Sequence, residues 1–96
     1  MNNSEKTIQE AAIEKRLRHR LLAFGARCEK WGRHGWPDRI VIWPGGRVDF
    51  IELKAPGKKP RPLQQKRAAQ LRAMGCHTAT LDSAAAVDKY IQEGKS

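Results

Sequence analysis

The stretch that decides the fold runs from Gly35 to Lys54 and reads Gly-Trp-Pro-Asp-Arg-Ile-Val-Ile-Trp-Pro-Gly-Gly-Arg-Val-Asp-Phe-Ile-Glu-Leu-Lys. Its β-branched and aromatic residues predict two strands, at residues 39–43 and 47–53. Pro44-Gly45-Gly46 is typical of the turn between them. Residues 40 and 42 alternate with residues 41 and 43, and all four are apolar, which predicts a central strand covered on both faces.

The hairpin brings polar residues together at its open end. Side chains alternate along a strand, so Glu52 and Lys54 share a face and Leu53 points the other way. The start of the first strand lies beside the end of an antiparallel second strand, which places Asp38 near this pair. Two carboxylates and one ammonium suit a divalent metal ion and a reacting phosphodiester.

Composition points to a polyanionic partner. The chain has 96 residues, with 19 basic and 10 acidic side chains and a net charge of +9. This charge favours nucleic acid, although a merely soluble basic protein is the plain alternative. The length predicts a single domain at 1–96, with residues 1–6 and 93–96 frayed. A core of this size makes a homodimer unsurprising.

The cysteines and histidines predict no zinc site. Cys28 and Cys76 stand far apart, and no histidine has metal-ligand spacing. The thiols are expected to be reduced, as in the cytoplasm. The sequence contains no signal peptide and no apolar run near 18 residues, so secretion and membrane spanning are disfavoured.

Two helices flank the predicted strands on either side in the sequence. Thr7-Ile8-Gln9-Glu10 matches a capping box, and a helix is expected to end at Phe24, before Gly25. Residues 63–74 predict a second helix, which ends before Gly75. Residues 55–75 carry six basic side chains and no acidic one.

Three short elements complete the pattern. Residues 26–31 and 77–81 predict strands, and Ser83 is a good N-cap for a last helix that runs to about Gln92. The order α-β-β-β-α-β-α indicates an α/β domain with a small mixed sheet flanked by helices.

At this point the sequence resembles a known family. Pro37-Asp38 followed by Glu52-Leu53-Lys54 is the signature of the PD-(D/E)XK nuclease superfamily, and the order of elements resembles its restriction-endonuclease-like αβββαβ core. The Gly35–Arg39 and Phe50–Gly57 segments, together with Gln64, are similar to a stand-alone VRR-NUC domain of phage and prophage type. The resemblance spans nearly the whole chain.

The resemblance implies roles for the polar residues. Asp38 and Glu52 would bind Mg²⁺ or Mn²⁺, and the Leu53 backbone carbonyl could add a ligand, as it does in the family. Lys54 would position or activate the attacking water, or stabilise the transition state. Taken singly, Asp38 could instead cap a turn, and Glu52 and Lys54 could form an exposed ion pair worth at most about 1 kcal/mol.

Two further residues are expected at the site. In related nucleases a glutamate on the first helix completes the metal site, and spacing favours Glu14 over Glu10; an ion pair with Arg18 is its alternative role. Gln64 matches a glutamine of VRR-NUC domains and could hold the water or a phosphate oxygen. Gln65 is the alternative candidate.

The DNA-binding candidates are all basic. The loop after Lys54 provides one group and the residues around Pro37-Asp38 another; they are Lys58, Lys59, Arg61, Arg33 and Arg39. Such contacts with phosphates would give affinity and not sequence specificity. Trp36 could pack on a partner subunit or on a base, whereas Trp43 is expected in the core.

Together these features predict a metal-dependent, structure-selective DNA endonuclease that cuts Holliday (four-way) junctions as a homodimer. A flap or other branched-DNA nuclease, and a catalytically silent nucleic-acid-binding module, are the alternatives. A sequence-specific restriction subunit would need readout loops that this chain barely has. The expected location is the cytoplasm of a bacterial or phage-infected cell.

Overall fold

All the predicted elements are present in the computed structural model, which describes residues 7–95. The expectation of fraying at residues 1–6 falls outside this part of the chain. In order, the elements are α1 (Ile8–Phe24), β1 (Arg27–Lys30), β2 (Arg39–Ile42), β3 (Val48–Leu53), α2 (Pro62–Ala73), β4 (His77–Leu81) and α3 (Ala84–Gly94).

Helix α1 begins and ends where its sequence signals predict. The Thr7 hydroxyl accepts a hydrogen bond from the Glu10 N–H at 3.0 Å. Gly25 follows the helix with a φ of 92°, which a residue without a Cβ adopts readily. Ser83 caps α3 in the same way, because its hydroxyl accepts from the Ala86 N–H at 3.0 Å.

The four strands form one mixed sheet in the order β1-β2-β3-β4. The first three strands are antiparallel neighbours, whereas β4 pairs with β3 in parallel after the crossover through α2. The α/β fold with a small mixed sheet is therefore confirmed.

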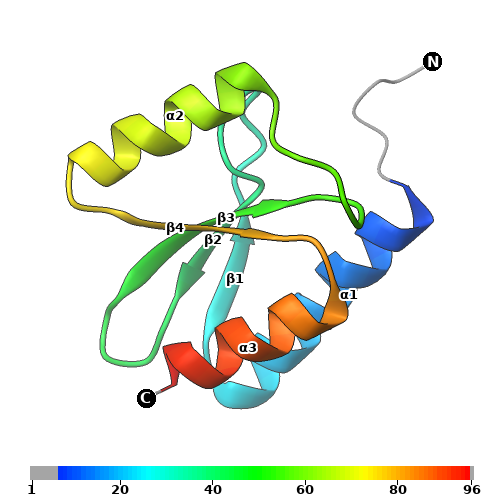
Figure 1. Ribbon diagram of the computed structural model, residues 1–96. Coiled ribbons are helices and arrows are strands. Elements are labelled where there is room, and N and C mark those ends of the chain that lie inside the picture. Colours follow the sequence, from blue (N-terminus) through cyan, green and yellow to red (C-terminus); the bar gives the residue numbers. More distant parts are fainter. Residues whose placement is uncertain (1–6, 96) are drawn as a thin grey trace.

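The main core lies on the face of the sheet that α1 and α3 cover (Figure 1). It contains fully buried side chains from both helices and from the two inner strands: Leu17, Leu21, Val87, Val41, Ile51 and Leu53. Helix α2 lies on the other face and buries only Leu71. The two faces of the sheet therefore differ in how completely they are packed.

This asymmetry corrects one expectation about β2. The strand is internal, and Val41 on its α1 side is fully buried. Ile42 on the opposite face remains 39% exposed. The strand is therefore covered completely on one face only, because α2 does not extend over the whole of the other.

The last helix also continues further than expected. It includes Glu93 and Gly94, whereas the sequence predicted an end near Gln92. The fraying expected for residues 93–96 stays a prediction, and Ser96 is outside the described residues. A Cβ added to Gly94 would lie 2.2 Å from the Trp43 ring. The end of the helix therefore packs closely against the buried Trp43.

Candidate active site

Asp38 lies at the entrance to β2, opposite the end of β3. The register pairs Arg39 with Ile51, so the next position along brings Asp38 to Glu52. The Leu53 N–H donates a hydrogen bond to Asp38 Oδ2 at 2.7 Å. A charge-assisted bond of this kind fixes the carboxylate against the neighbouring strand. The convergence that the hairpin predicts is therefore present.

Glu52 is a buried carboxylate with a shifted pKa. It is 7% exposed, and Lys54 Nζ lies 3.5 Å from its Oε2. Burial and then the negative charge of Asp38 raise the pKa of Glu52 to about 8, and Lys54 opposes this rise only in part. Because the carboxyl groups of Asp38 and Glu52 are close together, the site accommodates one negative charge more easily than two.

Such a pair suits a cation. A bound divalent ion would relieve the repulsion between the carboxylates, and their oxygens are the donors that Mg²⁺ and Mn²⁺ prefer. Asp38 and Glu52 therefore fit the ion that the sequence implies. Within residues 7–95, however, no three His, Cys, Asp or Glu side chains come close enough together to hold a metal ion.

Glu14 has another partner in this structure. Its Oε2 accepts a hydrogen bond from Arg39 Nε at 2.8 Å, and both side chains are only 13% exposed. A second guanidinium nitrogen of Arg39 donates to the Cys28 carbonyl at 3.2 Å. The ion pair joins α1 to the sheet. The sequence suggested Arg18 as a partner of Glu14, whereas the structure shows an ion pair with Arg39.

Gln64 links α2 to the carboxylate pair. Its Oε1 accepts from the Arg61 N–H at 2.8 Å, and its Nε2 donates to Glu52 Oε2 at 2.7 Å. The first bond fixes the orientation of the amide, because only an oxygen can accept there. Gln65, the alternative, instead donates to the Pro60 carbonyl at 2.7 Å. Gln64 therefore contacts Glu52 directly. From the sequence, the expected partner of Gln64 was the attacking water or a phosphate oxygen.

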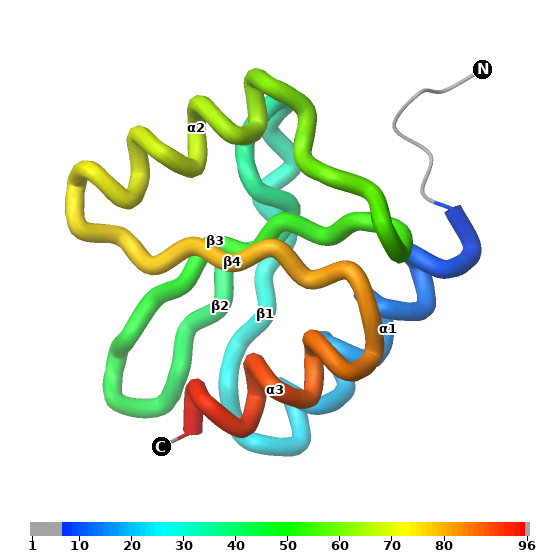
Figure 2. Tube along the Cα trace, viewed as in Figure 1, coloured from blue at the N-terminus to red at the C-terminus, as the bar shows by residue number. Residues whose placement is uncertain are grey.

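The basic candidates differ in accessibility. Lys58, Lys59 and Arg61 are exposed on the connection from β3 to α2, which Figure 2 traces as a green arc. Arg33 is also exposed, with its guanidinium 5.9 Å from the Trp36 ring. Arg39 is the exception, because its guanidinium is occupied inside the protein by Glu14 and Cys28. We therefore do not include Arg39 among the residues that could reach DNA.

An aromatic cluster beside the site was not predicted. The Trp31 ring lies 5.1 Å from that of Trp36 and 5.2 Å from that of Phe50, and Arg67 of α2 stacks 5.0 Å from Trp36. The sequence left the role of Trp36 open. Nothing local indicates these contacts, because they join residues from three separate segments. Trp43, in contrast, is buried as expected.

The fold and the residues of the hairpin together indicate the class of protein. A four-stranded mixed sheet with Asp38 facing Glu52 and Lys54 is the arrangement of a restriction-endonuclease-like nuclease domain. The chain superposes on a solved structure described as a VRR_NUC domain with a TM-score of 0.82 and 32% identity, over 90% of this chain and 97% of that one.

The sequence comparison agrees. The chain is 42% identical over 81 residues to "Putative nuclease p44" of Acyrthosiphon pisum secondary endosymbiont phage 1, a match that covers 81% of this chain and 87% of that protein. No family model matches the chain. The chain belongs to the VRR-NUC family of nucleases. None of the helices in residues 7–95 is long and apolar enough to cross a membrane.

Proposed function

We propose that this nuclease is a divalent-metal-dependent DNA endonuclease that cuts four-way junctions as a homodimer. The observation that carries the proposal is the convergence of Asp38 with the buried Glu52 and with Lys54 beside it. An ordinary surface ion pair would be exposed and would not raise the pKa of a carboxyl group to about 8.

The residues of the site would have separate roles in phosphodiester hydrolysis. Asp38 and Glu52 would hold the metal ion, with the Leu53 carbonyl as a further oxygen ligand, and Glu14 could join them only by leaving Arg39. When bound, the ion supplies Lewis-acid polarisation of the scissile phosphate. Lys54 orients the attacking water and stabilises the negative charge that develops on the phosphate. Gln64 holds Glu52 in position from α2.

The charge of the chain supports a DNA substrate. The net charge is +9, and the loop that carries Lys58, Lys59 and Arg61 leads directly from Lys54 to α2. Contacts with phosphates give affinity without sequence readout. A domain this small has little surface for reading bases, so recognition of DNA shape accounts better for its specificity.

The four-way junction and the homodimer belong together in this proposal. A junction has approximate two-fold symmetry, and two active sites related by a two-fold axis would cut a pair of its strands. A monomer with one site would suit a flap better. The mass of the protein in solution therefore bears on the substrate as well as on the assembly.

The test is cleavage of a panel of DNAs with Mg²⁺ or Mn²⁺: a four-way junction, a flap, a replication fork and a linear duplex. We expect the junction to be cut fastest. Asp38→Asn should fold, because an amide oxygen still accepts from the Leu53 N–H, but should lose at least about 100-fold in rate. Lys54→Gln should behave in the same way.

Each contrary result identifies an alternative. Faster cutting of the flap would replace the junction as the substrate, and discrete fragments from linear duplex would indicate sequence specificity. Tight binding without cutting would indicate a silent binding module. Catalysis at this site is refuted if Asp38→Asn and Lys54→Gln both cut as fast as the parent.

A further inference from the structure

A cavity opens between α2 and the sheet, directly beside Glu52 and Gln64. Its volume is about 190 Å³, and its walls come from β3, β4 and α2. This is far more than the roughly 10–15 Å³ that one water molecule needs. It lies on the face of the sheet where α2 buries only Leu71. A continuous apolar core does not fill this space, so the fold leaves room next to the carboxylate pair.

One wall of the cavity is aromatic. Phe50 lines it, two residues before Glu52 on the same face of β3. The Trp31 ring supports Phe50 from a centroid distance of 5.2 Å. Ala68, across the cavity on α2, is small and leaves the space open. A planar aromatic ligand would find both a surface to stack on and room to enter.

The rest of the lining combines small apolar residues with polar ones, and its charged side chains are Glu52 and Arg72. Thr78 and Thr80 of β4 and Gln65 of α2 line the cavity. Hydroxyl and amide groups can both donate and accept hydrogen bonds, so they suit varied ring edges. The only cation in the lining is Arg72, which already donates to the Thr78 hydroxyl at 3.0 Å. These walls suit a neutral ring better than a second phosphate.

We propose that this cavity receives an unstacked nucleobase of the DNA strand, next to the scissile phosphate. The inference rests on the proposed function, because it takes the phosphate to lie at Glu52. Bases that leave a helix are held by stacking on aromatic side chains and by hydrogen bonds at their edges, which are the features of these walls. The enzyme would then favour substrates in which a base at the cut is already unpaired or easily unstacked, as at a branch point.

The test compares two alanines on the same helix. Ala68→Leu fills the cavity, whereas Ala69→Leu adds the same atoms at the next position, which is exposed and outside the lining. The cleavage rates of both variants are measured on an intact four-way junction and on two modified junctions. One modified junction has a stable abasic nucleotide immediately before the cleavage position, and the other has it immediately after. The abasic form removes the base and keeps the phosphate.

The cavity proposal predicts a specific pattern of rates. Loss of one stacked base should slow the parent and Ala69→Leu by about tenfold at one of the two positions. Ala68→Leu should be about tenfold slower on the intact junction and should show no further loss on the abasic one. Phe50→Leu, which adds no volume, should show the same insensitivity. A general folding defect would slow both substrates equally, and circular dichroism would reveal it.

A binding measurement separates this proposal from the proposed function. In the Asp38→Asn background, 2-aminopurine at the sensitive position should become more fluorescent when the junction is bound, and added Ala68→Leu should abolish the change. If the parent cuts no DNA but this signal is seen, the cavity stands and the catalytic proposal fails. If the parent cuts while Ala68→Leu and Ala69→Leu behave alike and no signal appears, the cavity proposal is overturned.

Discussion

At the scale of single residues, Gln64 shows how one side chain connects a helix terminus to the site. Its oxygen accepts from the N–H of Arg61, the residue at the start of α2, and its nitrogen donates to Glu52. Because both ends of the amide are engaged, the position of Glu52 depends on where α2 begins. Under the proposed function Glu52 binds a metal ion, so we expect Gln64 to affect the reaction mainly by holding this carboxylate in position.

Gln64→Ala should therefore reduce kcat by about 10- to 100-fold and leave the KM for DNA nearly unchanged. Loss of the bond to Arg61 should lower the free energy of unfolding by only about 1 kcal/mol. Steady-state kinetics on the junction measure the first effect, and urea unfolding measures the second. Gln70→Ala is the matched control, because this exposed glutamine of α2 lies outside the cavity lining and its side chain accepts from Arg67 instead of contacting Glu52. Equal kinetics for the two variants would contradict the positioning role.

The ion pair of Glu14 and Arg39 leads to a second prediction at this scale. Both side chains are 13% exposed, so removal of one leaves a poorly solvated charge. Glu14→Ala should lower the free energy of unfolding by about 3 kcal/mol, and the double variant Glu14→Leu/Arg39→Met should recover much of this loss. Thermal and urea unfolding without metal provide the measurement. If the double variant is no more stable than Glu14→Ala, the loss of stability does not come from the unpaired charge of Arg39.

At the scale of the elements, the sequence predicts most of what builds the site. The helix caps at Thr7 and Ser83 and the turn at Pro44-Gly45-Gly46 are local signals, and each is present. A short turn sets the register of a hairpin, and the register alone brings Asp38 to Glu52. This part of the site is predictable because every step in it is a short-range rule.

The other contacts of the site are not local and could not be predicted in this way. Arg39 reaches Glu14 across 25 positions, and Gln64 reaches Glu52 across 12. Which charged side chains pair over such sequence separations depends on how the helices pack on the sheet. The spacing of residues in the sequence does not indicate this packing. The same applies to the space beside Phe50, because it results from the incomplete packing of α2.

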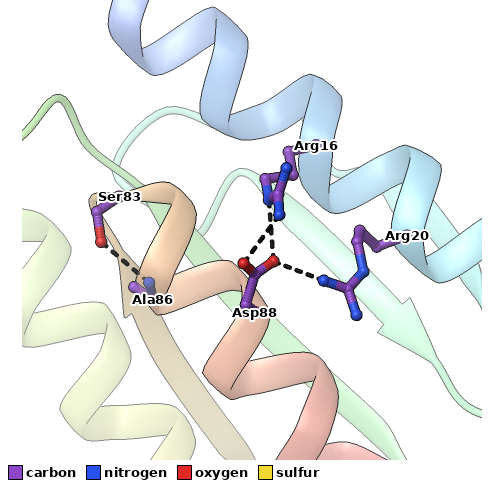
Figure 3. Close-up of polar contacts among 5 residues, drawn as sticks. All are labelled: Arg16, Arg20, Ser83, Ala86 and Asp88. Atoms are coloured by element: carbon purple, nitrogen blue, oxygen red, sulfur yellow. Dashed lines mark hydrogen bonds and ion pairs between the residues drawn. The ribbon is translucent and has the colours of Figure 1, made fainter.

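The contact between α1 and α3 includes a pH-sensitive ion pair (Figure 3). Asp88 of α3 accepts from Arg16 at 2.8 and 2.9 Å and from Arg20 at 2.6 Å. These guanidinium groups, Arg16 first, lower the pKa of Asp88 from its ordinary value of 3.8. The folded state therefore binds this proton less readily than the unfolded state, so the pair stabilises the fold above pH 3.8 and ceases to do so as the pH falls below it.

Asp88→Asn should consequently lower the melting temperature slightly at pH 6, and the difference from the parent should disappear at a pH well below 3.8. The effect should be small and should shrink in high salt, because all three side chains are about 40% exposed. Thermal unfolding from pH 2 to pH 6 at two salt concentrations measures it. A difference that persists at the lowest pH would show that Asp88 acts by packing and not by charge.

At the scale of the whole molecule, charge is distributed unevenly over the two sides of the sheet. On the α1 side, acidic residues such as Asp88 and Glu14 compensate arginines. On the α2 side, residues 55–75 carry six basic side chains and no acidic one. Three of these six side chains, Lys58, Lys59 and Arg61, lie along the connection that leads from the site, where they could attract a DNA backbone.

This distribution predicts how salt acts on DNA binding. Each Lys that contacts a phosphate releases about one counterion, so Lys58→Ala and Lys59→Ala should each reduce the slope of log affinity against log salt by roughly 1. The loss should be the same for junctions of different sequence, because phosphates carry no sequence information. Lys89→Ala on α3 is the control, since it removes an exposed lysine from the other side of the sheet and should leave the slope unchanged. Fluorescence anisotropy with an Asp38→Asn background keeps the DNA intact during the titration. Equal changes of slope for all three variants would show that the net charge attracts DNA and that the loop after Lys54 has no particular part in it.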